Sequence, residues 1–97
     1  MVISLRLQHP EFPEPEVSET VNYALRKEAE QARLRRDYYA EQCHAFETKH
    51  EMSSDEFQAK FDAGTLGDAG EWFDWYAMKR GFNLWDRRFS ILSGVSV

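Results

Sequence analysis

The chain has 97 residues and a mass of 11.4 kDa, the size of one small domain, which excludes a two-domain enzyme. Its composition is 42% hydrophobic, 14% aromatic and 30% charged, so it is expected to fold rather than stay disordered. With 12 Lys and Arg against 17 Asp and Glu, the net charge of -5 argues against a general nucleic-acid binder and favours a partner with a basic surface.

Residues 1–15 are expected to form an extended N-terminal segment, because all three prolines of the chain lie there: Pro10, Pro13 and Pro15. Ahead of them, Ile3, Leu5 and Leu7 alternate with polar residues as in a half-buried strand. Such a strand would need a partner from another chain or from residues 89–97, and frayed termini are the alternative. No apolar run here resembles a signal peptide or a membrane span, so no membrane association is expected and the cytoplasm is the default location.

Residues 16–49 predict one long helix, because they contain no Gly or Pro and are rich in strong helix formers. An apolar stripe at roughly helical spacing follows its length: Val17, Val21, Leu25, Ala29, Ala32, Tyr39, Cys43 and Phe46. Two pairs are spaced for i,i+4 ion pairs on its outer surface: Arg26/Glu30 and Arg33/Asp37. A helix of about 30 residues spans roughly 45–50 Å, more than the diameter of a compact globule of this length. A second chain is therefore expected to cover part of the stripe.

A short helix is predicted over residues 54–63. Ser53 and Glu56 have the spacing of a capping box, and Met52 and Phe57 that of a hydrophobic staple. Gly64 then provides the left-handed residue that commonly follows a helix end.

A third helix is expected to begin at Asp68, which with Glu71 repeats the pattern of a helix start. Large apolar residues then recur at spacings of 3, 4, 3, 4 and 3, and form what we call the seam: Trp75, Met78, Phe82, Trp85, Phe89 and Leu92. Gly81 weakens a helix by about 1 kcal/mol relative to Ala, so either the helix bends there or a neighbouring helix comes close.

These elements predict an all-α protein, with one long helix, a short helix and a third aromatic-rich helix between short extended termini. The helical domain is expected over residues 16–94, followed by a C-terminal tail over 95–97. The seam and the long helix together predict a homo-oligomer, with a dimer formed through the first or the third helix as the expected state.

No residue is assigned to a metal, a cofactor or catalysis. Cys43, Glu47 and His50 share a helical face, but zinc would need a further ligand, so a partly buried cysteine beside solvent-facing histidines is the favoured interpretation. The single cysteine excludes an intramolecular disulfide, and an acidic helix is a poor setting for a thiolate nucleophile.

The segment from Glu51 to Asp74 is strongly acidic, with seven acidic residues against one basic residue, Lys60. Its carboxylates could serve as acid/base groups or magnesium ligands, but helix capping explains two of them more simply. The block is either a solvated face or a docking surface for a basic protein partner. The candidate partner-binding residues are Asp62, Asp68, Glu71 and Asp74.

Two basic clusters leave nucleic-acid binding open as an alternative. They lie in the first and third helices: Arg33, Arg35 and Arg36, and Lys79, Arg80, Arg87 and Arg88. Acidic residues surround them, and no phosphate loop, recognition helix or aromatic RNA platform accompanies them. Nucleic acid is therefore an unlikely partner by these criteria.

The stretch 57–75 resembles a group of small, uncharacterised helical proteins of archaea, cyanobacteria and other bacteria. The resemblance consists of a Gly-x-Leu-Gly-Asp turn at 64–68 followed by the acidic-aromatic helix start Glu71-Trp72-Phe73-Asp74-Trp75. Some members are encoded beside toxin genes and are treated as candidate antitoxins of type II toxin-antitoxin pairs. The resemblance thus implies an antitoxin-like or regulatory subunit that neutralises a basic partner. A structural homo-oligomer without another ligand is the competing interpretation.

Overall fold

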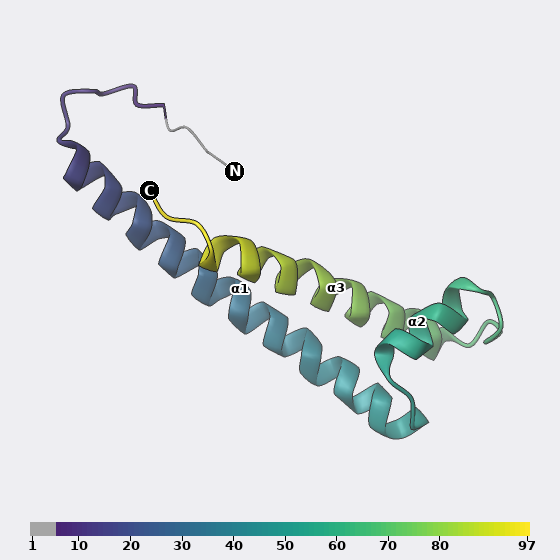
Figure 1. Ribbon diagram of the computed structural model, residues 1–97. Helices are drawn as coiled ribbons and strands as arrows, with labels where there is room; N and C mark the ends of the chain where they lie inside the picture. The colour runs from purple at the N-terminus through teal and green to yellow at the C-terminus, as the bar shows by residue number, and fades with distance from the viewer. Residues whose placement is uncertain (1–5) are drawn as a thin grey trace.

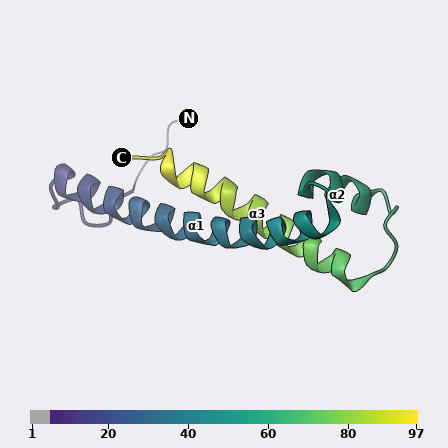
Figure 2. The same cartoon turned by 90° about the horizontal axis from the view of Figure 1, so that it is seen from below.

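The computed structural model describes residues 6–97, which contain three helices: α1 (Glu14–His50), α2 (Ser54–Asp62) and α3 (Gly70–Ser93). The predicted all-α class is confirmed. Helices α1 and α3 run antiparallel as a hairpin, and α2 lies across the end where α1 stops and α3 starts (Figures 1 and 2). The molecule measures 61 × 22 × 19 Å, with a radius of gyration of 19.1 Å. A compact chain of this length has a radius of gyration of about 12.5 Å, so the hairpin is strongly elongated.

Helix α1 begins at Glu14, inside the segment predicted to be extended. Pro13 is the N-cap residue and Pro15 lies in the first turn, where a proline's missing N–H leaves no hydrogen bond unmade. Two of the three prolines therefore mark the helix start rather than prolonging the connector. The helix ends at His50, and Glu51 follows it in the left-handed conformation with φ 51°.

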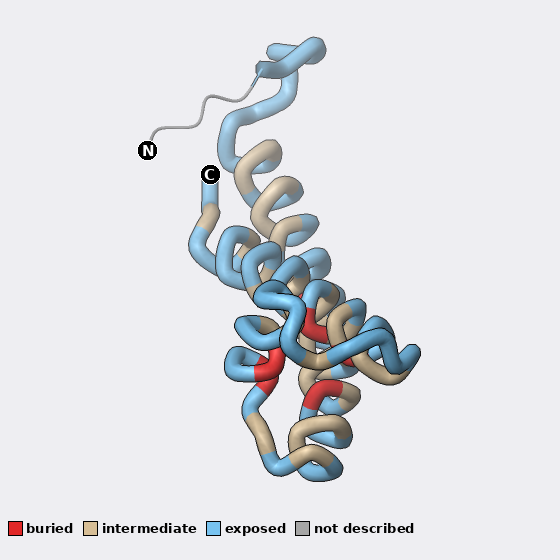
Figure 3. Tube along the Cα trace, turned by 90° about the vertical axis from the view of Figure 1, so that its right-hand side faces the viewer, coloured by how far each residue is buried: buried red, intermediate tan, exposed pale blue. Residues whose placement is uncertain are grey.

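The seam packs along α1 within the same chain. Trp75 is fully buried, and the other five seam residues are half-buried: Met78, Phe82, Trp85, Phe89 and Leu92. Two arginines of α1 cover aromatic rings of the seam, with the Arg35 guanidinium 4.5 Å from the Trp85 ring centroid and that of Arg36 4.6 Å from Phe89. Within residues 6–97 the buried apolar residues are few, and Figure 3 shows most of the chain as half-buried or exposed. Ala32 lies in the middle of α1, and the other three lie nearer the α2 end: Cys43, Phe57 and Trp75.

The C-terminal stretch does not form the strand considered for it. Residues 89–93 continue α3, because Phe89 and Leu92 are seam positions that pack on α1. The non-helical tail is tied to α1 by Asn22, whose side-chain amide donates to the Val97 carbonyl oxygen and accepts from the Val97 N–H, both at 2.9 Å. Ile3 and Leu5, the other half of the strand hypothesis, lie outside the described residues.

Candidate protein-binding surface

The acidic segment is built on an aromatic cluster where the three helices meet. The rings of Phe57 from α2 and Trp75 from α3 stack at 4.0 Å, and those of Phe61 and Tyr76 stack at 4.3 Å. Phe46 of α1 stacks on Trp75 from another direction at 5.6 Å. Stacked aromatic pairs stabilise a fold by more than the burial of their apolar area alone. These contacts therefore hold the short α2 against the hairpin.

Three polar contacts fix the start of α2 in the same place. The indole Nε1 of Trp75 donates to Ser54 Oγ at 2.9 Å, and the Ser54 N–H donates to Glu47 Oε2 at 2.9 Å. Lys79 Nζ lies 2.8 Å from Oδ1 of Asp55, and the hydrogen bond from this ammonium lowers the pKa of that carboxyl. The α2 end of the hairpin, residues 51–74, is therefore bound to both long helices.

The Ser53 cap predicted for α2 is confirmed, and the Asp68 cap predicted for α3 is not found. Ser53 Oγ accepts a hydrogen bond from the Glu56 N–H at 3.1 Å, and Gly64 adopts φ 73° after the end of α2. Helix α3, however, has Ala69 as its N-cap residue and begins at Gly70, so the prediction that Asp68 caps it is wrong. Gly67 at φ 81° turns the chain ahead of Asp68, and the Trp72 N–H donates to the Ala69 carbonyl instead.

Internal ion pairs occupy several carboxylates of the acidic segment. Glu71 accepts from Lys49 Nζ at 2.7 Å and from His50 Nε2 at 2.9 Å, and these bonds lower the pKa of its carboxyl. Asp55 pairs with Lys79, and Lys60 lies 3.4 Å from Glu56. Of the four candidate residues, Glu71 thus ties α3 to the end of α1. The other three are exposed and form no ion pair within residues 6–97: Asp62, Asp68 and Asp74.

A pocket of about 170 Å³ lies behind α2 and was not anticipated from the sequence. Its lining includes Cys43, Ser54 and Lys79. Lys79 follows Trp75 by four residues and precedes Phe82 by three, so it lies on the apolar face of its helix. A lysine in that position was the one feature of the sequence that could have indicated a polar site inside the packing. Ser54 and Lys79 are engaged by the contacts described above, which makes the pocket part of the packing of α2.

Cys43 is only 5% exposed, more deeply buried than the sequence indicated. Burial first, and then the nearby Glu47 carboxylate, raise the pKa of its thiol, so it stays protonated at neutral pH and offers no thiolate nucleophile. Glu47 and His50, the other members of the metal-like pattern, turn to Ser54 and Glu71. Across residues 6–97, no three His, Cys, Asp or Glu side chains are placed to hold a metal ion.

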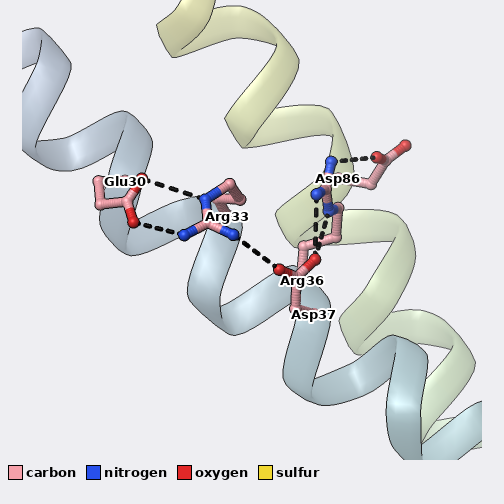
Figure 4. Close-up of polar contacts among 5 residues, drawn as sticks. All are labelled: Glu30, Arg33, Arg36, Asp37 and Asp86. Carbon is pink, nitrogen blue, oxygen red and sulfur yellow. Dashed lines mark hydrogen bonds and ion pairs between the residues drawn. The ribbon is translucent and has the colours of Figure 1, made fainter.

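The arginine clusters are engaged only in part: Arg33 and Arg36 form ion pairs within the chain, whereas Arg35, Arg80, Arg87 and Arg88 form none within residues 6–97. Arg33 bonds to Glu30 and, at 3.1 Å, to Asp37, whereas Arg36 lies 3.0 Å from Asp37 and 3.8 Å from Asp86 of α3 (Figure 4). The predicted Arg33/Asp37 pair is confirmed, while Glu30 pairs with Arg33 and not with Arg26. The acidic partners offset the positive charge of Arg33 and Arg36, which phosphate binding would require, so the exposed arginines of α3 are the groups left to the nucleic-acid alternative.

In comparisons with protein-family models, with curated proteins and with solved structures, no match to this chain is found. None of the helices in the described part of the chain is long and apolar enough to span a membrane.

Proposed function

We propose that this protein is a non-catalytic protein-binding module that engages a basic partner through the exposed carboxylates of its α2 end. The observation that carries the proposal is that only some of the acidic residues there form ion pairs within the chain. Ion pairs within the chain engage Asp55, Glu56 and Glu71, whereas Asp62, Asp68 and Asp74 are exposed and have no ion-pair partner within residues 6–97. Folding therefore leaves surplus negative charge on a surface that the aromatic cluster holds in place.

Such a surface acts mainly on the rate and specificity of association. Exposed charges steer a complementary partner over roughly a Debye length, about 10 Å at 0.1 M salt, and like charges repel wrong partners. The toxin of a type II pair is one basic protein of the expected class, as the resemblance of residues 57–75 implies. An antitoxin-like or regulatory subunit is accordingly the role that we propose for the module.

Charge reversal tests the proposal directly. Asp62→Lys combined with Asp68→Lys should abolish capture of a basic protein from native lysate at about 50 mM salt, and about 500 mM salt should weaken capture by the wild type. The matched control reverses Glu19 and Glu28, which are exposed on the half of α1 far from the α2 end, and so has the same net charge. Captured proteins are identified by mass spectrometry. Equal capture by both variants would contradict the proposal.

The nucleic-acid alternative makes the opposite prediction for the same reagents. The Asp62/Asp68 reversal would strengthen binding to DNA or RNA, and Arg87→Ala with Arg88→Ala would remove it. Fluorescence anisotropy with random duplexes and single strands at low salt measures both effects. A dissociation constant tighter than about 1 µM for the wild type would favour nucleic acid over a basic protein.

A further inference from the structure

The side of α3 turned away from α1 carries basic and apolar residues in alternation. Arg80, Leu84, Arg87 and Ile91 follow one another at spacings of 4, 3 and 4, which places all four on one face of the helix. Leu84 and Ile91 are 45% and 57% exposed, and both arginines are exposed as well. We call these four residues the outer α3 stripe. The stripe lies opposite the seam, and beyond α2 no other described helix runs along it (Figure 1).

The positive charge of the outer α3 stripe is not neutralised within residues 6–97. Arg80 and Arg87 form no ion pair there, and Asp86, the one side-chain carboxylate in residues 75–93, lies 3.8 Å from Arg36 of α1. The last turn of α3 has no basic residue, so the two arginines lie too far from the helix end to complement its dipole. The stripe therefore presents unpaired guanidinium groups beside exposed apolar side chains.

We propose that the outer α3 stripe binds an acidic amphipathic helix of another protein. Alternating spacings of 3 and 4 residues form the line along which one helix packs its side chains against a second. Leu84 and Ile91 contact apolar residues of the partner helix, while carboxylates of that helix pair with Arg80 and Arg87. A guanidinium group suits such a pair, because it can bind a carboxylate through two parallel hydrogen bonds.

This inference goes beyond the proposed function, because the two surfaces have opposite charge and select different partners. The α2 end exposes carboxylates, whereas residues 79–93 contain four basic residues against one acidic residue. Charge complementarity steers each surface toward its own partner and repels the other. The protein thus links a basic protein at its α2 end to an acidic helix along α3.

The order of residues along the stripe disfavours a lipid surface as the ligand. A helix that lies on a membrane buries a continuous apolar face and keeps its basic residues on the polar side. Here Arg87 lies between Leu84 and Ile91. Insertion of the two apolar side chains would carry this charge toward the acyl chains, which is costly.

A nucleic acid would use only half of the stripe. Its phosphate groups can bind the two arginines, but they offer no apolar contact to Leu84 or Ile91. A protein helix covers both kinds of side chain, and covering the apolar area adds affinity to the ion pairs. The apolar members of the stripe therefore favour a protein over a nucleic acid.

The length of the stripe sets the expected affinity. Phe73 lies on the same side of α3, but its ring already packs on Phe61 of α2 at 5.5 Å, so the stripe begins at Arg80. From Arg80 to Ile91 the helix rises roughly 16 Å, or about three turns. Interfaces this small are typically weak, so we expect a dissociation constant of about 10–100 µM.

A synthetic acidic helix serves as the probe. The peptide has about three heptads, with leucine at positions a and d and glutamate at e and g. A second peptide replaces every glutamate by glutamine, and a third has the same composition in scrambled order. Fluorescence anisotropy with purified full-length protein at about 50 mM salt should show binding of the first peptide and at least about tenfold weaker binding of the other two. Absence of binding at about 1 mM, or equal binding of the scrambled peptide, would overturn the proposal.

Matched charge reversals locate the binding site. Arg80→Glu combined with Arg87→Glu should weaken binding of the acidic peptide at least about tenfold, because two ion pairs are replaced by repulsion. The control reverses Arg26 and Lys27, which are exposed on α1, and so has the same net charge. It should bind within about threefold of the wild type, and circular dichroism shows whether each variant keeps its helices. An equal loss in both variants would show a general effect of net charge and would contradict the assigned site.

A polar substitution tests the apolar half of the stripe without a change in charge. Leu84→Gln should weaken binding of the acidic peptide about fivefold, whereas Leu34→Gln on the exposed face of α1 should leave it unchanged. If Leu84→Gln bound like the wild type, the partner helix would not cover the stripe, and the proposal would fail.

Two further ligands separate the other classes of macromolecule. Vesicles of phosphatidylcholine with phosphatidylserine and a random DNA duplex are measured against the same variants. Binding of either ligand that is tighter than that of the acidic peptide, and that Arg80→Glu with Arg87→Glu removes, would replace the helix by that ligand. The acidic peptide has no basic residue and cannot pair with the carboxylates of the α2 end, so these outcomes are independent of the Asp62/Asp68 capture experiment.

Discussion

Gly81 sets how closely α1 and α3 approach each other. A Cβ atom placed there would lie 2.5–2.7 Å from ring atoms of Tyr39, well inside van der Waals contact. Of the two possibilities that the sequence left for this glycine, the close approach of a neighbouring helix is therefore the one found. The tyrosine ring of α1 packs where any other residue of α3 would carry a side chain.

We expect Gly81→Ala to destabilise the fold although alanine favours helix. Overpacking against Tyr39 costs about 1–3 kcal/mol, which exceeds the gain of about 1 kcal/mol in helix propensity. In a Tyr39→Ala background the clash is absent, so Gly81→Ala should become stabilising by up to about 1 kcal/mol. Urea unfolding of the four proteins measures this change of sign. Additive effects of the two substitutions would show that the ring does not limit the approach.

The two expected helix caps should respond differently to alanine. Ser53→Ala removes the acceptor of the Glu56 N–H and should lower the free energy of unfolding by about 0.5–2 kcal/mol. Asp68→Ala removes no cap of α3, whose N-cap residue is Ala69, and should change stability by less than about 0.5 kcal/mol. Thermal unfolding followed by circular dichroism compares the two. A larger loss for Asp68→Ala would mean that this carboxylate caps α3 after all.

At the scale of elements, α2 depends on its neighbours. Its 9 residues are too few for a stable isolated helix, so most of its stability comes from packing. Phe57 is fully buried against Trp75, and Ser54 accepts the hydrogen bond of that indole. The exposed carboxylates of the α2 end are thus positioned by contacts that lie behind them.

The Glu71 tie between α3 and the end of α1 should make stability depend on pH. Hydrogen bonds from Lys49 first, and then from His50, lower the pKa of Glu71 from its usual 4.5, so the folded state favours the carboxylate. This contribution is present above about pH 4.5 and is lost as the pH falls through the lower pKa of the folded state. Glu71→Gln should therefore lower the melting temperature at pH 7, and the deficit should shrink as the pH falls below about 4.5 toward 3.

The control for this prediction is Glu41→Gln, an exposed carboxylate on α1. Melting temperatures of both variants and the wild type are compared at the two pH values by circular dichroism. A deficit of Glu71→Gln that persists unchanged at low pH would assign the effect to packing of the side chain rather than to its charge.

At the scale of the whole molecule, elongation places the proposed partner surface at one end of the hairpin. The α2 end lies where α1 stops and α3 starts, whereas the start of α1 lies at the opposite end (Figure 1). Asp62 and Asp68 lie in α2 and in the turn before α3 begins, so the surface that they form does not extend along the two long helices.

The sequence by itself determined the elements whose signals are local. The absence of Gly and Pro over residues 16–49 was sufficient for α1, and Ser53 with Gly64 was sufficient to bound α2. The heptad spacing of the seam also predicted a helix with one apolar face. All of these signals involve residues that are close together along the chain, so they can be recognised from the sequence without the tertiary structure.

Only the tertiary structure decided which groups meet. The seam was equally suited to a second chain or to α1, and the loop lengths that let α3 fold back along α1 settled the choice within the chain. Glu71 was read as a free carboxylate and as part of a helix start, but it pairs with Lys49 and His50, which precede it by 22 and 21 residues. Asp68 matched a cap by its spacing, and the turn at Gly67 displaced the helix start beyond it. Such contacts depend on packing between segments distant in sequence, which no local pattern encodes.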